Sequence, residues 1–332
     1  MGLVKKILYA VAQKRFIGFF SKQSIFPTYH LVNNDSRKHI SHLYPFKNEI
    51  QFNQDLDILE KNYNQLNVQH LIENGKIPEK SFLISFDDGL SEIYTIIYPI
   101  LKSRNINAVF FINPDFVDNQ ALLYKHKISV IIDKLSSIDF QNKIVSEICN
   151  FLNYKFELKA EFINHLKNIQ FNENDKIDAI AKILNINFDE YLLTEKPYIT
   201  KNQIQEMIND GFYFGGHTMS HAPLQQLDFE QQKTEILNSI NWLKLNFEIE
   251  YSLFAFPYTD KNISKKLINA LLEYDEKIII FGNSGLKKDI DTRIIQRFSL
   301  ENPNENPARK IVTEHFYKCY NKLIGKYKIA RP

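Results

Sequence analysis

The chain has 332 residues, enough for one large barrel or two modest domains, and its composition (44% hydrophobic, 24% charged) is ordinary for a soluble globular protein. No run of about 20 apolar residues occurs, which excludes a membrane-spanning helix, and the two distant cysteines exclude a disulfide framework and a thiolate zinc site. The formal net charge is only +2, and no basic patch with stacking aromatics indicates a nucleic-acid site.

The two ends of the chain are basic. Residues 1–22 carry five basic and no acidic side chains, and residues 308–332 carry seven basic side chains against one acidic. We expect both ends to be helical and to contact an anionic surface.

The first helix is amphipathic, because Leu3, Val4, Ile7, Leu8 and Val11 fall on one helical face. A helix docked on the protein and a helix lying on a membrane both fit this pattern. A secretory signal peptide is the third interpretation, although the apolar run is short for one.

The first half of the chain predicts a βαβ unit. Residues 23–45 are loop-like and contain the short Tyr29–His30 segment, in which a lone histidine is more often structural than functional. A helix is expected over 52–63, a strand over 82–86, a helix over 90–104 and a strand over 108–112. Such a unit requires a parallel sheet.

Residues 118–197 show helical periodicity without a convincing strand, and we expect a helical insertion there. Strands and helices then alternate again along the chain. Helices are expected over 201–210, 228–247 and 262–274, and strands over 212–216, 252–256, 277–281 and 294–300. Polar motifs fall at the ends of these strands, so the sequence predicts one catalytic α/β barrel over residues 1–332.

Two adjacent carboxylates, Asp87 and Asp88, follow the strand over 82–86. Ligands bind at the carboxyl ends of parallel strands. Neighbouring anions repel each other, so a cation between or beyond them favours the pair. One carboxylate can then ligate a metal while the other acts as a base. The alternative is an N-cap for the helix that follows.

A second motif, His217-Thr218-Met219-Ser220-His221, also follows a strand. On a helical turn the i, i+4 spacing places both imidazoles on one face, where they can hold one ion. Surface or capping histidines are the alternative. Two histidines and a carboxylate form a known zinc set with open positions, which suits amide or ester hydrolysis.

Ser85-Phe86-Asp87-Asp88-Gly89, the His217–His221 motif and Phe254-Ala255-Phe256-Pro257-Tyr258 resemble the first three motifs of the polysaccharide deacetylases, the NodB-homology family. The resemblance implies a distorted (β/α) barrel, Zn²⁺ or another divalent metal, and hydrolysis of an N-acetyl group from an amino sugar. It implies Asp87 as the general base and Asp88, His217 and His221 as metal ligands. It also implies an acetyl pocket lined by Pro257 and Tyr258, with the Tyr258 N–H as a candidate oxyanion donor.

The chain departs from the family pattern at two places. Many members carry an arginine where this chain has Ala255, a form that resembles a Phe-Ala-Tyr-Pro subgroup; Arg297 is a candidate replacement for that charge, and a surface ion pair is the alternative. The last motif lacks its usual histidine, so the general acid is unassigned among Asp260, Glu301 and His30. We expect Asp260 and Arg297 on the substrate side of the site.

The sequence thus predicts a metal-dependent N-deacetylase acting on an amino sugar of a surface polysaccharide or its lipid-linked precursor. We expect a cytoplasmic protein, peripheral at the inner face of the membrane. Two rivals stay open: a catalytically inactive glycan-binding barrel, and a deacylase of a non-sugar amide or ester.

Overall fold

The computed structural model describes residues 2–140 and 143–332. Met1, in the expected basic end over 1–22, and residues 141–142, in the expected insertion over 118–197, lie outside the described residues. Eight parallel strands form the main sheet in the order β10-β1-β4-β5-β6-β7-β8-β9. Their bounds are β1 Pro27–Tyr29, β4 Ile84–Phe86, β5 Ala108–Ile112, β6 Tyr213–Gly216, β7 Leu253–Ala255, β8 Ile279–Gly282, β9 Ile294–Gln296 and β10 Phe298–Ser299. A small second sheet pairs β2 (Asn64–Gln65) with β3 (Ser81–Phe82).

The main sheet closes on itself through one stretch of chain. β9 pairs with β8 at one edge and β10 pairs with β1 at the other, yet only Arg297 separates β9 from β10. The predicted distorted (β/α) barrel is therefore confirmed, and Arg297 lies at the residue where the chain changes its pairing partner.

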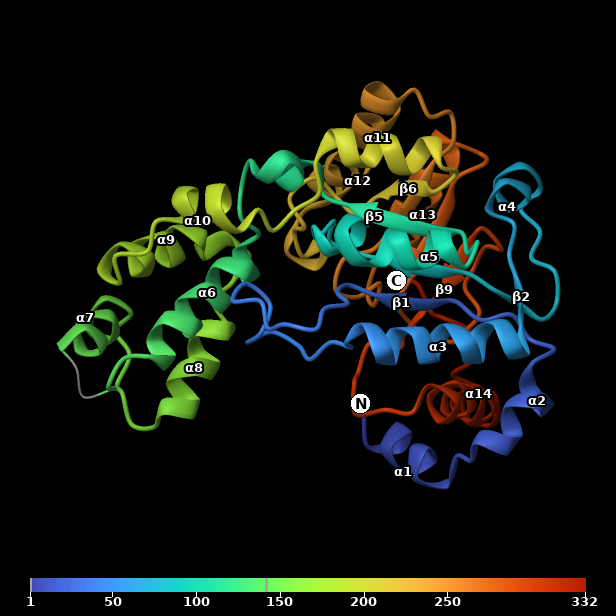
Figure 1. The fold of residues 1–332 in the computed structure, drawn as a ribbon, viewed down its shortest axis with the longest axis horizontal. Helices are drawn as coiled ribbons and strands as arrows, with labels where there is room; N and C mark the ends of the chain where they lie inside the picture. The colour runs from blue at the N-terminus through green and yellow to red at the C-terminus, as the bar shows by residue number, and fades with distance from the viewer. Residues whose placement is uncertain (1, 141–142) are drawn as a thin grey trace.

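Helices surround the barrel strands (Figure 1). Those that flank the barrel are α3 Glu49–Asn62, α4 Val68–Asn74, η2 Ile93–Ile97 (a π-helical turn), α5 Tyr98–Ser103, α11 Lys201–Asn209, α12 Phe229–Phe247 and α13 Lys265–Tyr274, with short 3-10 turns η3 Pro114–Asn119 and η5 Leu224–Gln226. α12 illustrates how the sequence specifies them. Asp228 caps its first turn in a capping box with Gln231. Ile236, Ile240 and Leu243 then recur at helical spacing and are buried.

The segment after η3 is helical and stands to one side of the barrel (Figure 1, green). It comprises α6 Tyr124–Ser136, α7 Lys143–Phe151, α8 Lys159–Lys167, η4 Phe171–Glu173, α9 Asn174–Ile183 and α10 Phe188–Glu195. Its apolar side chains form a cluster that also takes in Leu31, Ile40 and Leu90 from the barrel loops. The segment is therefore packed onto the loops that surround the carboxyl end of the sheet.

The two ends of the chain lie together. α1 (Leu3–Val11), η1 (Lys14–Phe16) and α2 (Ile17–Phe20) all contact the C-terminal helix α14 (Pro307–Leu323), as Figure 1 shows. In the part of the chain that the structure describes, no helix combines the length and apolar character needed to cross a bilayer.

Candidate active site

Asp87 and Asp88 follow β4 directly, and both are buried. The Asp87 carboxylate forms a bidentate pair with the Arg297 guanidinium, at 2.7 Å from Nη1 to Oδ1 and 2.9 Å from Nη2 to Oδ2. Arg297 is itself 0% exposed, and it also donates to Ser85 Oγ at 2.9 Å and Asn283 Oδ1 at 2.9 Å. Burial alone raises the pKa of Asp87, but the adjacent guanidinium, together with His217 and His30, holds that pKa below its usual value. Asp87 is therefore a buried carboxylate kept ionised chiefly by its pair with Arg297.

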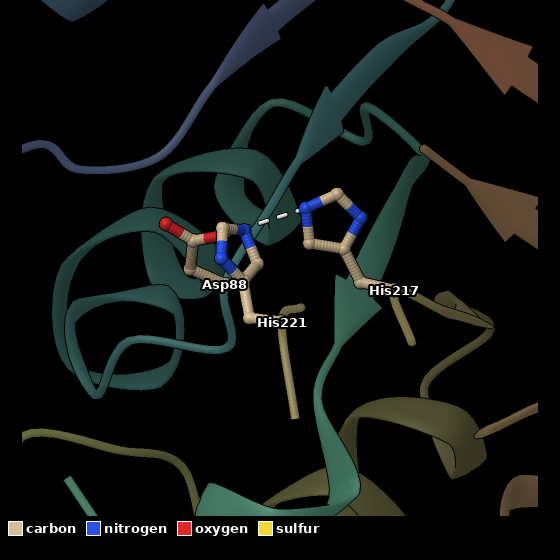
Figure 2. Close-up of side chains that lie close together, drawn as sticks. All are labelled: Asp88, His217 and His221. Carbon is tan, nitrogen blue, oxygen red and sulfur yellow. Dashed lines mark ion pairs between the residues drawn. The ribbon is translucent and has the colours of Figure 1, made fainter. Parts of the chain in front are cut away.

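Asp88 points to a different set of partners. Its Oδ1 lies 3.1 Å from His221 Nε2 and 3.5 Å from His217 Nε2, and Figure 2 shows the carboxylate and both imidazoles converging on one place. The three residues offer ligand atoms within 4.8 Å of one another. Asp88 Oδ1 is buried and makes no hydrogen bond within the described residues.

The loop that carries the two histidines is not helical, so the helical turn expected there is wrong. β6 ends at Gly216, and an irregular loop with left-handed φ at Thr218 (65°) and His221 (56°) turns both rings inward. His217 Nδ1 lies 2.8 Å from the Ala255 carbonyl, which directs Nε2 toward Asp88. Glu235 accepts from Ser220 N–H and Oγ–H, each at 3.0 Å, and fixes the far side of the loop.

Left-handed backbone gathers at this site. Asp88 (φ 73°), His221 (56°) and Tyr258 (52°) all adopt it, although none is glycine. Each such residue costs about 1 kcal/mol or more, and such residues concentrate at functional sites. The surrounding fold therefore holds these three side chains in positions that local preference alone would not choose.

The three residues fit a divalent metal. A buried carboxylate oxygen without a partner and two imidazoles whose Nε2 atoms face it are the donors that Zn²⁺ prefers. Burial lowers the pKa of His221, which favours the neutral imidazole that a metal requires. The Ala255 carbonyl at His217 supplies the outer contact typical of metal-binding histidines.

A cavity of about 310 Å³ opens onto Asp88 and His221. His30 and Tyr258 line it from the barrel, and further lining comes from the helical segment, through Leu123, Lys125, His126 and Lys167. No sequence signal predicts this wall, because the helical segment lacks a motif with ligand spacing. Tyr44, which also lines the cavity, has a hydroxyl buried without a hydrogen-bond partner among the described residues.

His30 and Glu301, two separate candidates in the sequence, form one unit. Glu301 Oε2 lies 2.9 Å from His30 Nδ1, and Glu301 Oε1 accepts from the N–H of His30 and of Leu31, each at 2.8 Å. Burial lowers the pKa of His30, but the Glu301 carboxylate more than compensates and raises it to about 10. Sheet closure brings them together: His30 follows β1 and Glu301 follows β10, and these strands pair with Thr28 opposite Ser299.

Two residues expected on the substrate side lie elsewhere. Asp260 is buried in a separate network, where Oδ2 accepts from Gln296 and Arg331, each at 2.8 Å, and Oδ1 accepts from Ser284 Oγ–H at 2.8 Å. Arg297 does not line the cavity and lies behind Asp87. Both side chains are thus paired with other residues, and neither is among the described residues that line the cavity. Pro257 precedes Tyr258, which does line the cavity and packs edge-on against His221.

The chain is similar to known proteins in sequence and in fold. Residues 74–277 match the family model described as polysaccharide deacetylase. Similar solved structures include the deacetylase PplD from Streptococcus pyogenes in complex with acetate, with a TM-score of 0.55 and 16% identity over 88% of this chain and 98% of that one. IcaB from Ammonifex degensii gives a TM-score of 0.52 and 16% identity over 88% and 97%. A de-N-acetylase from Aggregatibacter actinomycetemcomitans gives 0.51 and 18% over 85% and 96%. At these identities the likeness is one of fold. Among curated proteins, none matches the chain.

Proposed function

The chain belongs to the polysaccharide deacetylase family, and from that premise we propose that it is a metal-dependent hydrolase that removes the N-acetyl group from an amino sugar. The family supports carbohydrate deacetylation in general. The observation that carries the finer proposal is the arrangement of the two adjacent carboxylates: Asp87 is paired with Arg297, while Asp88 Oδ1 faces two histidine rings and makes no hydrogen bond among the described residues.

In this proposal Asp88, His217 and His221 hold the divalent cation, and zinc suits a set of two histidines and one carboxylate. When bound there, such a cation lowers the pKa of a water molecule and polarises a carbonyl group. The contacts from Ala255 and Glu235 keep the loop that carries the two histidines in place before the ion arrives.

Asp87 is proposed as the general base. It takes a proton from the attacking water as the water oxygen bonds to the acetyl carbonyl carbon. Arg297 keeps the carboxylate ionised and fixes both of its oxygens, so its role is to position Asp87. Arg297 reaches Asp87 from the β9–β10 junction and supplies the charge that many family members place at the position of Ala255 here.

His30 is proposed as the general acid. Glu301 holds its Nδ1, so the Nε2 proton is available on the ring that lines the cavity. When the carbon–nitrogen bond breaks, the leaving amine takes that proton and acetate is released. The backbone N–H of Tyr258 is proposed to stabilise the negative charge on the carbonyl oxygen, with Pro257 fixing the turn before it.

The cavity volume favours a single sugar residue. At about 310 Å³ it lies at the small end of ligand pockets, which span about 300–1,000 Å³. The helical segment forms one wall of this cavity, which supports a small substrate group at the site. We therefore propose a terminal N-acetylated sugar of a surface polysaccharide or of its lipid-linked precursor, handled on the cytoplasmic side at the membrane surface.

Acetate release tests this proposal. The wild type and Asp87→Asn are incubated with added zinc and with nucleotide-linked, lipid-linked and free oligomeric N-acetylhexosamines. We expect release by the wild type from at least one of them and a collapse in Asp87→Asn. A non-sugar acetyl ester is included as a further substrate. No release from any, with metal bound, would support a glycan-binding barrel instead, and release only from the acetyl ester would support a deacylase.

A further inference from the structure

Helix α1 packs onto α14 through its polar groups. Lys5 Nζ lies 2.7 Å from the Glu314 carboxylate, and the Tyr9 hydroxyl accepts from the Asn306 N–H at 2.8 Å. Arg309 donates to the carbonyl of Tyr9 at 2.6 Å and to that of Ala12 at 3.0 Å. Val4 and Leu8 are half-buried and Ala12 is buried, so α1 is held on α14 by these hydrogen bonds together with one apolar edge.

A second apolar edge of α1 points outward. Leu3, Ile7 and Val11, spaced i, i+4 and i+8, are 76%, 59% and 57% exposed, and Phe19 on the adjoining α2 is 80% exposed. A helix docked on a globular protein normally buries such a stripe. We call these four side chains the α1–α2 surface.

The charges around the α1–α2 surface are of one sign. Lys6, Lys14, Arg15 and Lys22 are exposed and form no ion pair with any residue in the described ranges 2–140 and 143–332. No acidic residue occurs in residues 1–22. An apolar stripe flanked by unpaired basic side chains matches a surface that offers hydrocarbon beneath a layer of negative charge.

We propose that the α1–α2 surface binds an anionic lipid bilayer, with Leu3, Ile7, Val11 and Phe19 inserted at the level of the headgroups. Lys6, Lys14, Arg15 and Lys22 contact the phosphates of anionic lipids. A protein partner of matching shape would need acidic side chains around its own apolar groove, whereas an anionic bilayer supplies both features everywhere. α1 keeps its contacts with α14 throughout, because the inserted side chains are those that already point outward.

The proposed lipid-binding surface adjoins the catalytic end of the barrel. Gly2, Leu3 and Lys5 share a cavity of about 610 Å³ with Asn283 and Asn302. Asn283 accepts from Arg297, the partner of Asp87, and Asn302 directly follows Glu301, the partner of His30. Docking would therefore bring the catalytic end close to the membrane. The idea that docking brings the site to a lipid-linked sugar rests on the proposed function. Lipid binding by the α1–α2 surface does not rest on it.

Sedimentation with vesicles tests the proposal. The full-length protein is mixed with vesicles of phosphatidylcholine alone, or of phosphatidylcholine and phosphatidylglycerol in equal parts, at low and high salt. We expect binding to the anionic vesicles that weakens with salt. Leu3→Ser/Ile7→Ser/Val11→Ser should weaken that binding by about one hundredfold, because three apolar side chains lose their transfer from water. Lys6→Glu/Lys14→Glu should abolish the preference for anionic vesicles.

Matched controls separate the surface from general stickiness. Leu193→Ser and Leu245→Ser remove side chains that are 75% and 83% exposed on α10 and α12, and binding should not change. Absence of vesicle binding by the wild type would overturn the proposal. So would a wild-type dimer in light scattering that the triple serine variant converts to a monomer without any vesicle binding. Acetate release from a soluble substrate should be equal in the wild type and the triple variant, so failure here leaves the proposed function standing.

Discussion

The carboxyl end of the barrel, where the candidate active site lies, and the α1–α2 surface differ from the usual distribution of side chains between interior and surface, and they differ in opposite ways. At the first, Asp87, Asp88 and Arg297 are charged groups placed inside the protein; at the second, Leu3 and Ile7 are apolar groups placed outside it. Buried charges are costly unless paired, and exposed apolar stripes lose the stabilisation of burial. We propose that something outside the chain completes both arrangements: a divalent cation at Asp88 in the first and a bilayer at the second.

The largest effect is expected at His30. His30→Gln keeps a polar side chain of similar reach but removes the proton donor, so kcat/KM for acetate release should fall by about 10²- to 10⁴-fold. The free energy of unfolding should also fall, because the buried Glu301 carboxylate loses its cation. Activity equal to that of the wild type would remove His30 from the mechanism and leave the acid to be found elsewhere.

Arg297→Met should have the next largest effect, on stability as well as activity. It leaves the Asp87 carboxylate buried without its cation, and breaking such a pair costs about 3–5 kcal/mol. Chemical denaturation measures this cost. Arg297→Lys is the matched control, because it keeps the charge but loses the two-point contact with the carboxylate. Its free energy of unfolding should lie between those of Arg297→Met and the wild type. Equal stability in all three would show that the pair does not hold Asp87.

Glu301→Gln should shift the alkaline limb of the pH profile of kcat/KM to lower pH. Glutamine still accepts from the N–H groups of His30 and Leu31, but its neutral side chain no longer raises the pKa of His30 to about 10. His30 must be protonated to act as the acid, so activity should be lost at lower pH in the variant than in the wild type. In the wild type, the stability from this pair is complete below pH 6.5 and declines as pH rises toward about 10. Identical alkaline limbs in the pH profiles of kcat/KM would contradict the pairing.

The smallest effect is expected at the α1–α2 surface. Replacing Leu3, Ile7 or Val11 singly by serine should change the free energy of unfolding in solution by less than about 0.5 kcal/mol, because each of these side chains is more than half exposed. Thermal unfolding measures this directly. A loss of 2 kcal/mol or more, of the size seen at buried positions, would show that these side chains are covered in solution and that the contrast between the two regions is false.

The sequence predicted the barrel and the residues at its strand ends because strand ends are marked locally. Asp87, Asp88 and His217 each follow an apolar run that a reader can recognise. The pairing of His30 with Glu301 could not be predicted in the same way, because 271 residues separate them and only the closure of the sheet brings them together.

The conformation of the loop that carries His217 and His221 could not be predicted from the sequence either. The spacing of His217 and His221 fits a helical turn, yet the loop reaches the same convergence through left-handed residues that tertiary contacts impose. For α1 the sequence shows an amphipathic helix but not which face is inward. That depends on Glu314 and Arg309, which come from the other end of the chain.

One paired measurement tests the central claim most directly: bound divalent metal and acetate release, determined on the same samples of wild type, Asp87→Asn and Asp88→Asn. The two variants carry the same change at neighbouring buried carboxylates, so each is the control for the other. The account predicts that Asp87→Asn keeps the metal and loses activity, whereas Asp88→Asn loses both. Full activity in Asp87→Asn, or unchanged metal content in Asp88→Asn, would contradict it.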